Sequence, residues 1–371
     1  MRLLVSAGGT GGGVYPALAV LQTLNRESHE ILWVGSQGGM EADLVQRAGY
    51  RFEAIPAAGI HGVGIGALPG NLLKILTGYY AARRILAEYK PQVMLFTGGY
   101  VSIPVAIAGR RYPSVVFLPD IEPGFSIKLI SRFADRIAVT TADSIKYFPH
   151  EPKVVVTGYP TRSELQMWTP DAARERLHLD RERRTLLVFG GSQGARSINR
   201  AVMRILPDLL QRLQVVHLTG KGNWQETLDE QAKLDEHLSQ HYHPYPYLHG
   251  DELGAAFTAA DLVVSRAGAA TLGEFPLFGL PAILVPYPYA WKYQKVNADY
   301  LAQHGAALVL PDADMQTKLL DMILDLLDHP QRLQAMQNAA KALANPGAAK
   351  TIGTLLENLT QHPRNLKGGP A

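Results

Sequence analysis

The sequence predicts an α/β protein of two Rossmann-like domains, each built on a parallel sheet. Short Val- and Leu-rich runs alternate with stretches of helical spacing, a pattern typical of parallel sheets covered on both faces. An apolar run that ends in a glycine turn before a helix occurs twice, in LLVSAGGTGGGVYPAL (3–18) and in LLVFGGSQGARSIN (186–199). A length of 371 residues suits two domains. We therefore expect two similar units that face each other across a ligand-binding cleft.

The first domain is expected to span residues 1–162. Its helices are predicted at 15–24, from about Met40, and at 72–89, the last one after a glycine-rich loop. Its strands are predicted at 3–7, 31–34, 52–55, 93–96, 115–118, 136–139 and 154–156.

The second domain is expected to span residues 163–345, after a charged linker around 161–185. Its strands are predicted at 186–189, 215–218, 245–248, 262–264, 282–285 and 307–310. A helix is predicted at about 317–344, and a last helix, at about 346–361, is expected to pack back on the first domain. The tail at 362–371 is predicted to be disordered.

Composition excludes several classes of protein. The chain has no cysteine, which rules out disulfides, thiolate zinc sites and a cysteine nucleophile. Its net charge of +3 is too small to indicate nucleic-acid binding, although the excess of basic residues lies in the first 160 positions. Glycines interrupt the first apolar run, unlike a signal peptide, and no apolar stretch reaches the roughly 18 residues that cross a bilayer. We expect a cytoplasmic protein that is free or attached to a membrane surface.

The glycine turn at 8–13 has the geometry that brings backbone N–H groups and a positive helix end to a phosphate or another oxygen-rich ligand. It is not a dinucleotide fingerprint, because the third glycine of GxGxxG falls on Val14 and no acid follows the second strand at Gly35 and Ser36. It is not a nucleoside-triphosphate loop, because no Lys-Ser/Thr pair follows the glycines. A tight turn without a ligand is the structural alternative, although so many glycines carry a cost in chain entropy.

Two stretches of the second domain have similar features. In 190–196 the Ser192 hydroxyl and the amides at a helix start suit an anion, and a helix N-cap is the alternative role of that serine. In SRAGAATLGE (265–274) small residues follow a strand and expose the amides of a first helical turn. Glu274 is then placed to accept two hydroxyls of a sugar, and a solvated surface acid is its alternative role.

An acidic pair follows the last predicted strand. Asp312 and Asp314 resemble a metal-binding pair of carboxylates. They also precede a helix, so we expect them to cap that helix and assign no metal site.

The motifs form an ordered set. They read GGTGGGVYPALAV, MEADLV, GGYVS, GYPTR, GGSQGAR, RAGAATLGE and GLPAILVP, followed by Gln294 and Asn297. In this order they resemble the peptidoglycan N-acetylglucosaminyltransferases of glycosyltransferase family 28, over residues 3 to about 359. The resemblance implies a two-domain GT-B fold and an inverting transfer that uses neither a metal nor a cofactor. The donor it implies is UDP-N-acetylglucosamine, and the acceptor is a membrane-bound muramyl-pentapeptide diphosphoryl-polyprenol.

The resemblance also implies roles for individual residues. Ser192 and the amides of Ala269 and Ala270 would meet the diphosphate, Glu274 the ribose hydroxyls and Gln294 the sugar hydroxyls. The implied donor side comprises Thr10, Gly11, Gly12, Arg162, Ser192, Ala269, Ala270, Thr271, Leu272, Gly273, Glu274 and Gln294. The implied acceptor side comprises Gly13, Gly98, Gly99, Tyr100 and Ser102.

The chain departs from the family pattern where a base should accept the proton of the attacking hydroxyl. Gly13 replaces the usual histidine after GGTGG, and LPDIEPG (118–124) replaces the usual HEQN segment. Because two new carboxylates follow a strand there, we hypothesise that Asp120 or Glu122 is the catalytic base. The alternative is that both only cap a turn. The approach to Gln294 differs as well and reads WKY.

An anionic membrane surface is a further predicted partner. Leu72, Leu73, Ile75 and Leu76 lie beside basic residues, a combination that suits an anionic leaflet. The basic residues are Lys74, Arg83, Arg84, Arg110, Arg111, Lys128 and Arg132. We expect a peripheral protein on the inner face of the cell membrane. An ordinary amphipathic helix packed on the sheet is the alternative.

Two other functions stay open. One is a family 28 transferase with a different lipid or glycan acceptor, which the changed 118–124 segment permits. The other is a sugar-nucleotide-binding protein that lost catalysis together with the histidine. A UDP-sugar 2-epimerase, which shares the fold type, is disfavoured because the sequence shows no separate acid/base set.

Overall fold

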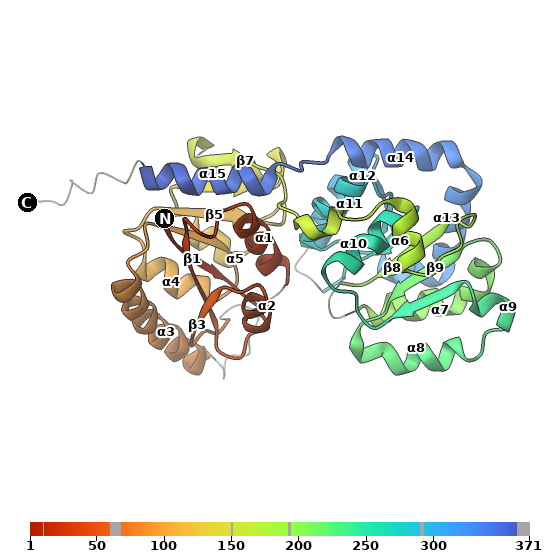
Figure 1. Cartoon of the computed structure of the whole chain (residues 1–371), viewed down its shortest axis with the longest axis horizontal. Helices are drawn as coiled ribbons and strands as arrows, with labels where there is room; N and C mark the ends of the chain where they lie inside the picture. Colours follow the sequence, from red (N-terminus) through yellow and green to blue (C-terminus); the bar gives the residue numbers. More distant parts are fainter. Residues whose placement is uncertain (10, 60–67, 150, 192–193, 290–292, 362–371) are drawn as a thin grey trace, which may run out of the picture. The chain divides into compact units, whose positions relative to one another are not determined.

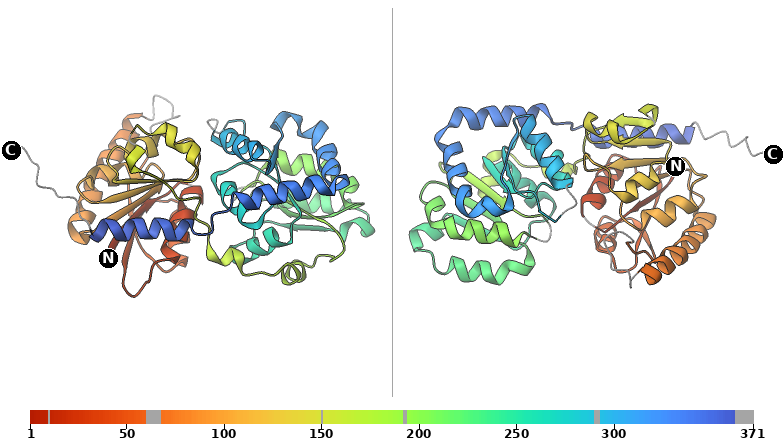
Figure 2. Two further views of the ribbon diagram at one scale, coloured as in Figure 1. Left: turned by 90° about the horizontal axis from the view of Figure 1, so that it is seen from above. Right: turned by 180° about the vertical axis from the view of Figure 1, so that it is seen from behind.

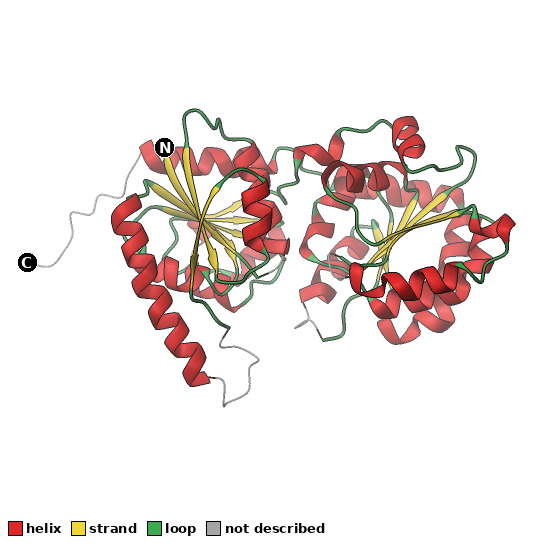
Figure 3. Ribbon diagram, turned by 60° about the horizontal axis from the view of Figure 1, so that its bottom comes forward, coloured by secondary structure: helices red, strands yellow, loops and turns green. Residues whose placement is uncertain are grey.

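The chain folds into two α/β units. The computed structural model describes residues 1–9, 11–59, 68–149, 151–191, 194–289 and 293–361. One unit is formed by Met1–Arg162 with Pro346–Ala371 and the other by Ser163–Asn345. Each is a parallel sheet with helices on both faces (Figure 1, Figure 3). The predicted fold class, two parallel-sheet α/β units, is confirmed.

The described part of the first unit holds a seven-stranded sheet in the order β3-β2-β1-β4-β5-β6-β7, with every pair parallel. Its strands are β1 (Arg2–Ala7), β2 (Glu30–Ser36), β3 (Arg51–Ile55), β4 (Val93–Gly98), β5 (Ser114–Leu118), β6 (Arg136–Val139) and β7 (Val154–Val156). Its helices are α1 (Gly11–Gln22), α2 (Glu41–Arg47), α3 (Leu68–Tyr89), α4 (Ser102–Ala108), α5 (Phe125–Ile130) and α15 (Ala348–Gln361). This order makes the loops after β1, β4 and β5 neighbours at the carboxyl edge of the sheet.

The last helix, α15, returns to the first unit, where it contacts α1, β4 and β5. Figure 2 shows it lying along that unit. Gly353 permits a close approach to α1, because a Cβ there would lie 3.1 Å from Oγ1 of Thr23. Nε2 of His29 lies 3.4 Å from a carboxylate oxygen of Glu357, which adds a polar contact to this packing.

The described part of the second unit holds a six-stranded parallel sheet in the order β10-β9-β8-β11-β12-β13. Its strands are β8 (Thr185–Phe189), β9 (Gln214–Leu218), β10 (Tyr242–Tyr245), β11 (Leu262–Ser265), β12 (Ala282–Leu284) and β13 (Ala307–Val309). Its helices are α6 (Pro170–Arg176), α7 (Arg196–Leu210), α8 (Trp224–Gln231), α9 (Glu236–Ser239), α10 (Gly250–Ala259), α11 (Glu274–Phe278), α12 (Tyr293–Gln303), α13 (Met315–Asp328) and α14 (Pro330–Ala342).

Two predicted elements of the second unit differ from the structure. The strand predicted at 245–248 lies earlier, at β10 (Tyr242–Tyr245), which is an edge strand and so tolerates Pro244 within it. The single helix predicted at 317–344 is divided into α13 and α14, because Pro330 starts a new helix after a break at His329.

A polar cluster lies inside the second unit. His217 on β9 is completely buried, with Nδ1 2.9 Å from the hydroxyl of Tyr242 and Nε2 3.1 Å from Oδ1 of Asn199. Burial lowers the pKa of His217 to about 3, since the charged imidazolium would lose its hydration there. Asn199 also donates to the carbonyl oxygen of Thr219 at 2.8 Å. A neutral histidine thus ties α7 to β9 and β10.

We expect this histidine to make folding pH-dependent. The unfolded state binds a proton at an ordinary His pKa near 6.5, whereas folded His217 does so only near pH 3. Its contribution to stability is therefore complete above about pH 6.5 and is lost as the pH falls toward 3, by about 1.4 kcal/mol per pH unit. Urea unfolding at pH 7, 5.5 and 4.5 gives the free energy of unfolding at each pH. This free energy should fall less steeply with falling pH in His217→Gln than in the wild type. The exposed His237→Gln variant should keep the wild-type slope, and an equal slope in all three proteins would contradict the assignment.

Candidate functional site

An irregularity between β1 and β4 shapes the carboxyl edge of the first unit. The register shifts so that Ser6 pairs with Phe96 but Ala7 pairs with Gly98, which leaves Thr97 as an extra residue. Oγ1 of Thr97 donates to the carbonyl oxygen of Gly13 at 2.5 Å. The bulge therefore connects the end of β4 to the first turn of α1.

The segment after β4 is packed on the glycine turn. Gly99 has φ +91°, and a Cβ there would lie 2.4 Å from the carbonyl oxygen of Gly8. Oγ of Ser102 donates to the carbonyl oxygens of Ser6 at 2.9 Å and of Gly98 at 2.8 Å. The two glycine segments are therefore in backbone contact and fixed to one another.

The segment after β5 is anchored from β6 and the turn that follows it. Oγ1 of Thr140 donates to the carbonyl oxygens of Leu118 and Pro119, both at 3.0 Å. Oγ of Ser144 donates to the carbonyl oxygen of Ile121 at 2.9 Å. These three bonds hold the backbone of the segment in place.

Two carboxylates extend from this anchored backbone. Asp120 is partly exposed, and the Glu122 carboxylate is 30% exposed and lies 3.8 Å from Nζ of Lys128 on α5. The helix that follows them, α5, has Gly124 as its N-cap residue.

An arginine from a distant part of the sequence contacts the start of α1. Arg162 follows β7 and is buried, and its guanidinium carbon lies 4.2 Å from the ring centroid of Tyr15. A stacked cation of this kind is stabilised by about 0.5–2 kcal/mol. A Cβ at Gly11 would lie 3.0 Å from the same ring. Arg162 and the glycines of α1 are therefore neighbours.

An ion-paired network joins the loops at the carboxyl edge of the second unit. Arg266, directly after β11, donates to Oδ1 of Asp312 at 2.5 Å, to Oγ of Ser197 at 2.6 Å and to the carbonyl oxygen of Val285 at 3.1 Å. Its guanidinium carbon lies 5.2 Å from the ring centroid of Tyr287. Because Arg266 is buried, these partners replace the water that its charge would otherwise bind.

The stretch after Arg266 forms a tight turn. Ala269–Leu272 is a 3-10 helix, and the Thr271 hydroxyl donates to the carbonyl oxygen of Gly268 at 2.7 Å. The N–H groups that open such a turn have no acceptor within it. Glu274 begins α11 and is buried at 7% exposure, so it is not a solvated surface acid.

Two polar residues of α12 contact the neighbouring loops. Oε1 of Gln294 accepts the N–H of Tyr287 at 2.8 Å, which fixes the orientation of the amide. Buried Asn297 donates to the carbonyl oxygen of Ala267 at 3.2 Å. The helix thus supports the loops that follow β11 and β12.

Comparison with known proteins identifies the family. Residues 3–139 match the glycosyltransferase family 28 N-terminal domain, and residues 185–352 match the glycosyltransferase family 28 C-terminal domain. A relative from Roseiflexus sp. (strain RS-1) is 39% identical over 97% of this chain and 95% of its own length. The chain belongs to glycosyltransferase family 28.

The family 28 relatives share one activity name. The Roseiflexus protein and a Desulforamulus reducens protein are both named UDP-N-acetylglucosamine–N-acetylmuramyl-(pentapeptide) pyrophosphoryl-undecaprenol N-acetylglucosamine transferase. The second is 38% identical over 97% of this chain and 99% of its own length.

Solved structures agree with the family 28 assignment. The crystal structure of Acinetobacter baumannii MurG has a TM-score of 0.75 at 28% identity and covers 96% of this chain and 99% of that one. A putative UDP-N-acetylglucosamine 2-epimerase from Listeria monocytogenes has a TM-score of 0.68 at 13% identity, covers 100% of this chain and 99% of that one, and shows the fold alone.

The described residues of the predicted family 28 site gather within each unit. The first unit brings together Gly11, Gly12, Gly13, Gly98, Gly99, Ser102 and Arg162, with Tyr100 42% exposed beside them and Asp120 and Glu122 on the next loop. The second brings together Ala269, Ala270, Thr271, Leu272, Gly273, Glu274 and Gln294. Thr10 and Ser192 lie outside the described residues.

Two predictions about the second unit need correction. The 269–272 stretch is a 3-10 turn and not the first turn of an α-helix, because α11 starts only at Glu274. Asp312 does not cap α13, since it binds Ser197 and Arg266 instead. Asp314 is the N-cap residue of α13, but its side chain makes no cap bond and accepts from Lys318. Sequence analysis gave no role to Arg266 in the family 28 motif. The sequence did contain a signal for this ion pair, namely an arginine directly after one apolar strand and an acid after another strand of the same domain.

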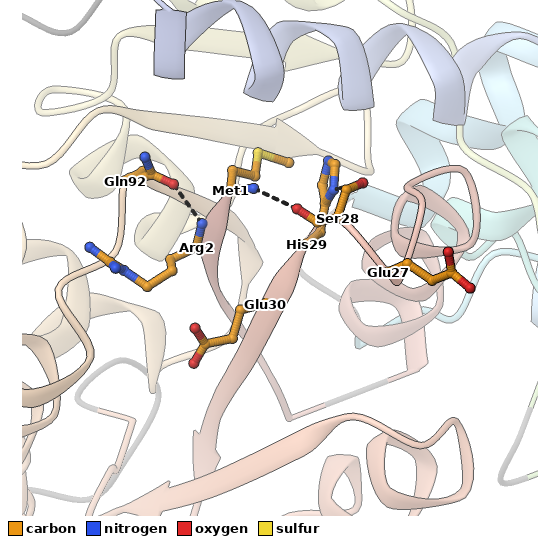
Figure 4. A pocket seen from close by; sticks show the side chains of 7 residues that line it. All are labelled: Met1, Arg2, Glu27, Ser28, His29, Glu30 and Gln92. Carbon is orange, nitrogen blue, oxygen red and sulfur yellow. Dashed lines mark hydrogen bonds between the residues drawn. The ribbon is translucent and has the colours of Figure 1, made fainter.

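A pocket lies at the opposite end of the first sheet (Figure 4). It is found at the amino ends of β1 and β2 and is lined by Met1, Arg2, Glu27, Ser28, His29, Glu30 and Gln92. It contains none of the predicted site residues. Across the described stretches, no three His, Cys, Asp or Glu side chains gather so as to hold a metal ion.

The contact between Gly8 and Gly99 yields a stability test. Gly99→Ala places a Cβ against a backbone oxygen at a positive φ, so we expect the free energy of unfolding to fall by about 2–5 kcal/mol. Gly70→Ala is the control, since no atom of the described residues lies within 4 Å of a Cβ there and Gly70 lies within α3. Urea unfolding measures both variants, and a Gly99→Ala protein as stable as Gly70→Ala would contradict the contact.

Proposed function

We propose that this chain transfers N-acetylglucosamine from UDP-N-acetylglucosamine to a muramyl-pentapeptide diphosphoryl-polyprenol, forming the disaccharide lipid used in peptidoglycan synthesis. The observation that carries the proposal is the nearly full-length relationship to family 28 proteins that are named for this transfer. The loops at the carboxyl edges of both sheets support the proposal, because they carry hydrogen-bond donors, a buried arginine and carboxylates.

The reaction needs one base and a stabilised leaving group. In an inverting displacement, the acceptor oxygen bonds to the anomeric carbon while the bond from that carbon to the diphosphate breaks. The electron pair leaves with UDP, and the hydroxyl proton passes to a base. Donors placed where this negative charge grows lower the barrier.

The second unit supplies the donor-binding groups in this proposal. The amides of Ala269 and Ala270 with Ser192 meet the diphosphate, buried Glu274 accepts ribose hydroxyls, and Gln294 binds the sugar hydroxyls through an amide already oriented by Tyr287. A buried carboxylate is stabilised by hydrogen-bond donors, and two ribose hydroxyls provide such donors.

The first unit supplies the acceptor-side groups and further donor contacts. Thr10, Gly11, Gly12 and Arg162 complete the donor side. On the acceptor side, exposed Tyr100 contacts the acceptor, and buried Gly13, Gly98 and Ser102 hold the backbone beneath it. We assign the base to Asp120 or Glu122, which stand on the anchored segment after β5. Arg162, stacked on Tyr15, offers a fixed positive charge to the diphosphate.

A second candidate function is sugar-nucleotide binding without catalysis. Gly13 favours it, since this position in the first turn of α1 has no side chain to take a proton. Release of UDP from UDP-N-acetylglucosamine only in the presence of the acceptor would exclude it. Binding of UDP without such release would exclude the transferase.

We expect Asp120→Asn or Glu122→Gln to lower kcat by 10²- to 10⁴-fold, because the amide cannot accept the hydroxyl proton. The measurement is product formation from UDP-N-acetylglucosamine and the polyprenyl acceptor, with UDP binding checked by calorimetry. Glu88→Gln is the control, since Glu88 is another exposed carboxylate paired with a basic residue. A loss below tenfold in both variants would remove these acids from the role of base.

We further propose that α3 attaches the chain to an anionic membrane surface. Leu72, Leu73 and Leu76 are 56%, 62% and 50% exposed, and Tyr80 one turn later is 66% exposed. The alternative that these leucines pack on the sheet is therefore wrong. Lys74 is exposed on the same helix, which suits anionic headgroups. In the described part of the chain, no helix is long and apolar enough to cross a bilayer.

We expect the double substitution of Leu72→Gln and Leu76→Gln to weaken binding to anionic vesicles at least tenfold, because two apolar side chains no longer enter the lipid. Lys74→Gln should weaken binding about fivefold at low salt and less at high salt. Cosedimentation with vesicles measures both effects. Leu228→Gln, an exposed apolar position of the second unit, is the control. Vesicle binding that changes neither with salt concentration nor on substitution of these leucines would contradict the proposal.

A further inference from the structure

A buried acid stands behind the glycine turn of the first unit. Glu41, the first residue of α2, has 0% exposure. Its carboxylate accepts hydrogen bonds from the N–H of Ser36 at 2.7 Å, the Oγ of Ser36 at 2.5 Å and the N–H of Gly9 at 3.3 Å. Within the described ranges, no lysine or arginine pairs with it. The reaction steps proposed above do not use this group.

Three glycines make room for this carboxylate. A Cβ at Gly8 would lie 2.4 Å from Oε1 of Glu41, and one at Gly39 would lie 2.4 Å from both oxygens. A Cβ at Gly35 would lie 2.9 Å from its Cγ. Glycines from the ends of two strands and from the loop before α2 therefore converge on one side chain.

The bonding of this acid determines which way one amide points. An ionised carboxylate only accepts hydrogen bonds, and in the interior it needs donors in place of water. The N–H of Gly9 is one of those donors, and Gly9 is held at φ +85°. The amide is therefore directed into the unit, at a place where an anion-binding loop would direct it toward the ligand.

We propose that Glu41 is a positioning residue for the glycine turn. It holds Gly8 and Gly9 in one conformation and so presets the first turn of α1, the wall that the acceptor contacts. It also keeps the N–H of Gly9 away from the substrates, so that this amide does not bind phosphate. Glu41 touches no substrate and acts only through the turn. Its effect on turnover rests on the proposed function, whereas its effect on Gly9 does not.

The test uses Glu41→Gln, whose amide nitrogen is a donor facing other donors. We expect hydrogen exchange at the Gly9 amide, followed by NMR, to become at least tenfold faster. We also expect kcat/KM for the polyprenyl acceptor to fall 10- to 100-fold, while the Kd of UDP stays within twofold. Glu53→Gln is the control, because Glu53 on β3 pairs with exposed Arg51 and does not contact the turn. It should leave all three quantities unchanged.

Two milder variants keep the test decisive if Glu41→Gln does not fold. Ser36→Ala removes one donor to the carboxylate, and Glu41→Asp shortens its reach. Both should speed exchange at Gly9 and raise the KM for the acceptor more than they change UDP binding. Unchanged exchange at Gly9 would overturn the proposal, as would an equal loss of acceptor use and UDP binding. A wild-type protein that performs no transfer would refute the proposed function, while exchange at Gly9 would still decide the role of Glu41.

Discussion

The extra residue in β4 is the constraint on which the first unit depends. In a regular parallel pair, Ala7 would pair with Thr97, the residue after Phe96. The bulge leaves Thr97 unpaired, and Ala7 pairs with Gly98 instead. The hydroxyl of Thr97 then reaches the first turn of α1, and Gly99 arrives directly over Gly8. Strand order makes the two glycine segments neighbours, and this shift accompanies their close backbone contact.

In the second unit, the loops at the carboxyl edge are held together by a buried charged side chain. The loops after β11, β12 and β13 and the start of α7 are joined by Arg266, which replaces hydration with bonds to Asp312, Ser197 and the carbonyl of Val285. A buried cation held in this way is costly to separate from its partners, because each would be left unpaired. Gly194 adds a backbone contact, since a Cβ there would meet the carbonyl of Thr219 at 2.2 Å. The loops at the carboxyl edge of the second sheet are therefore held in fixed positions.

Local chemistry explains which features the sequence could predict. Strand and helix alternation and the glycine turns follow from periodicity and short motifs, which a linear pattern contains. The burial of Glu274 does not, since the motif alone is equally compatible with a solvated acid. The pairing of Arg266 with Asp312 depends on strand order, which no local pattern encodes. Exposure of Leu73 was equally hidden, because helical spacing shows that a face is apolar but not whether the sheet covers it. The role of Glu41 needed the convergence of Gly8 with Gly35 and Gly39, which lie in a later part of the sequence.

The missing histidine narrows the choice of proton acceptor. Gly13 offers only backbone atoms, and its carbonyl already accepts the Thr97 hydroxyl. In the described segments that directly follow β1, β2, β4 and β5, the carboxylates are Glu41, Asp120 and Glu122. Glu41 is enclosed, with both oxygens engaged by donors, and cannot reach a substrate hydroxyl. Under the proposed function, the segment after β5 is therefore the candidate to take the proton, since its backbone is anchored by Thr140 and Ser144 while its acids are partly exposed.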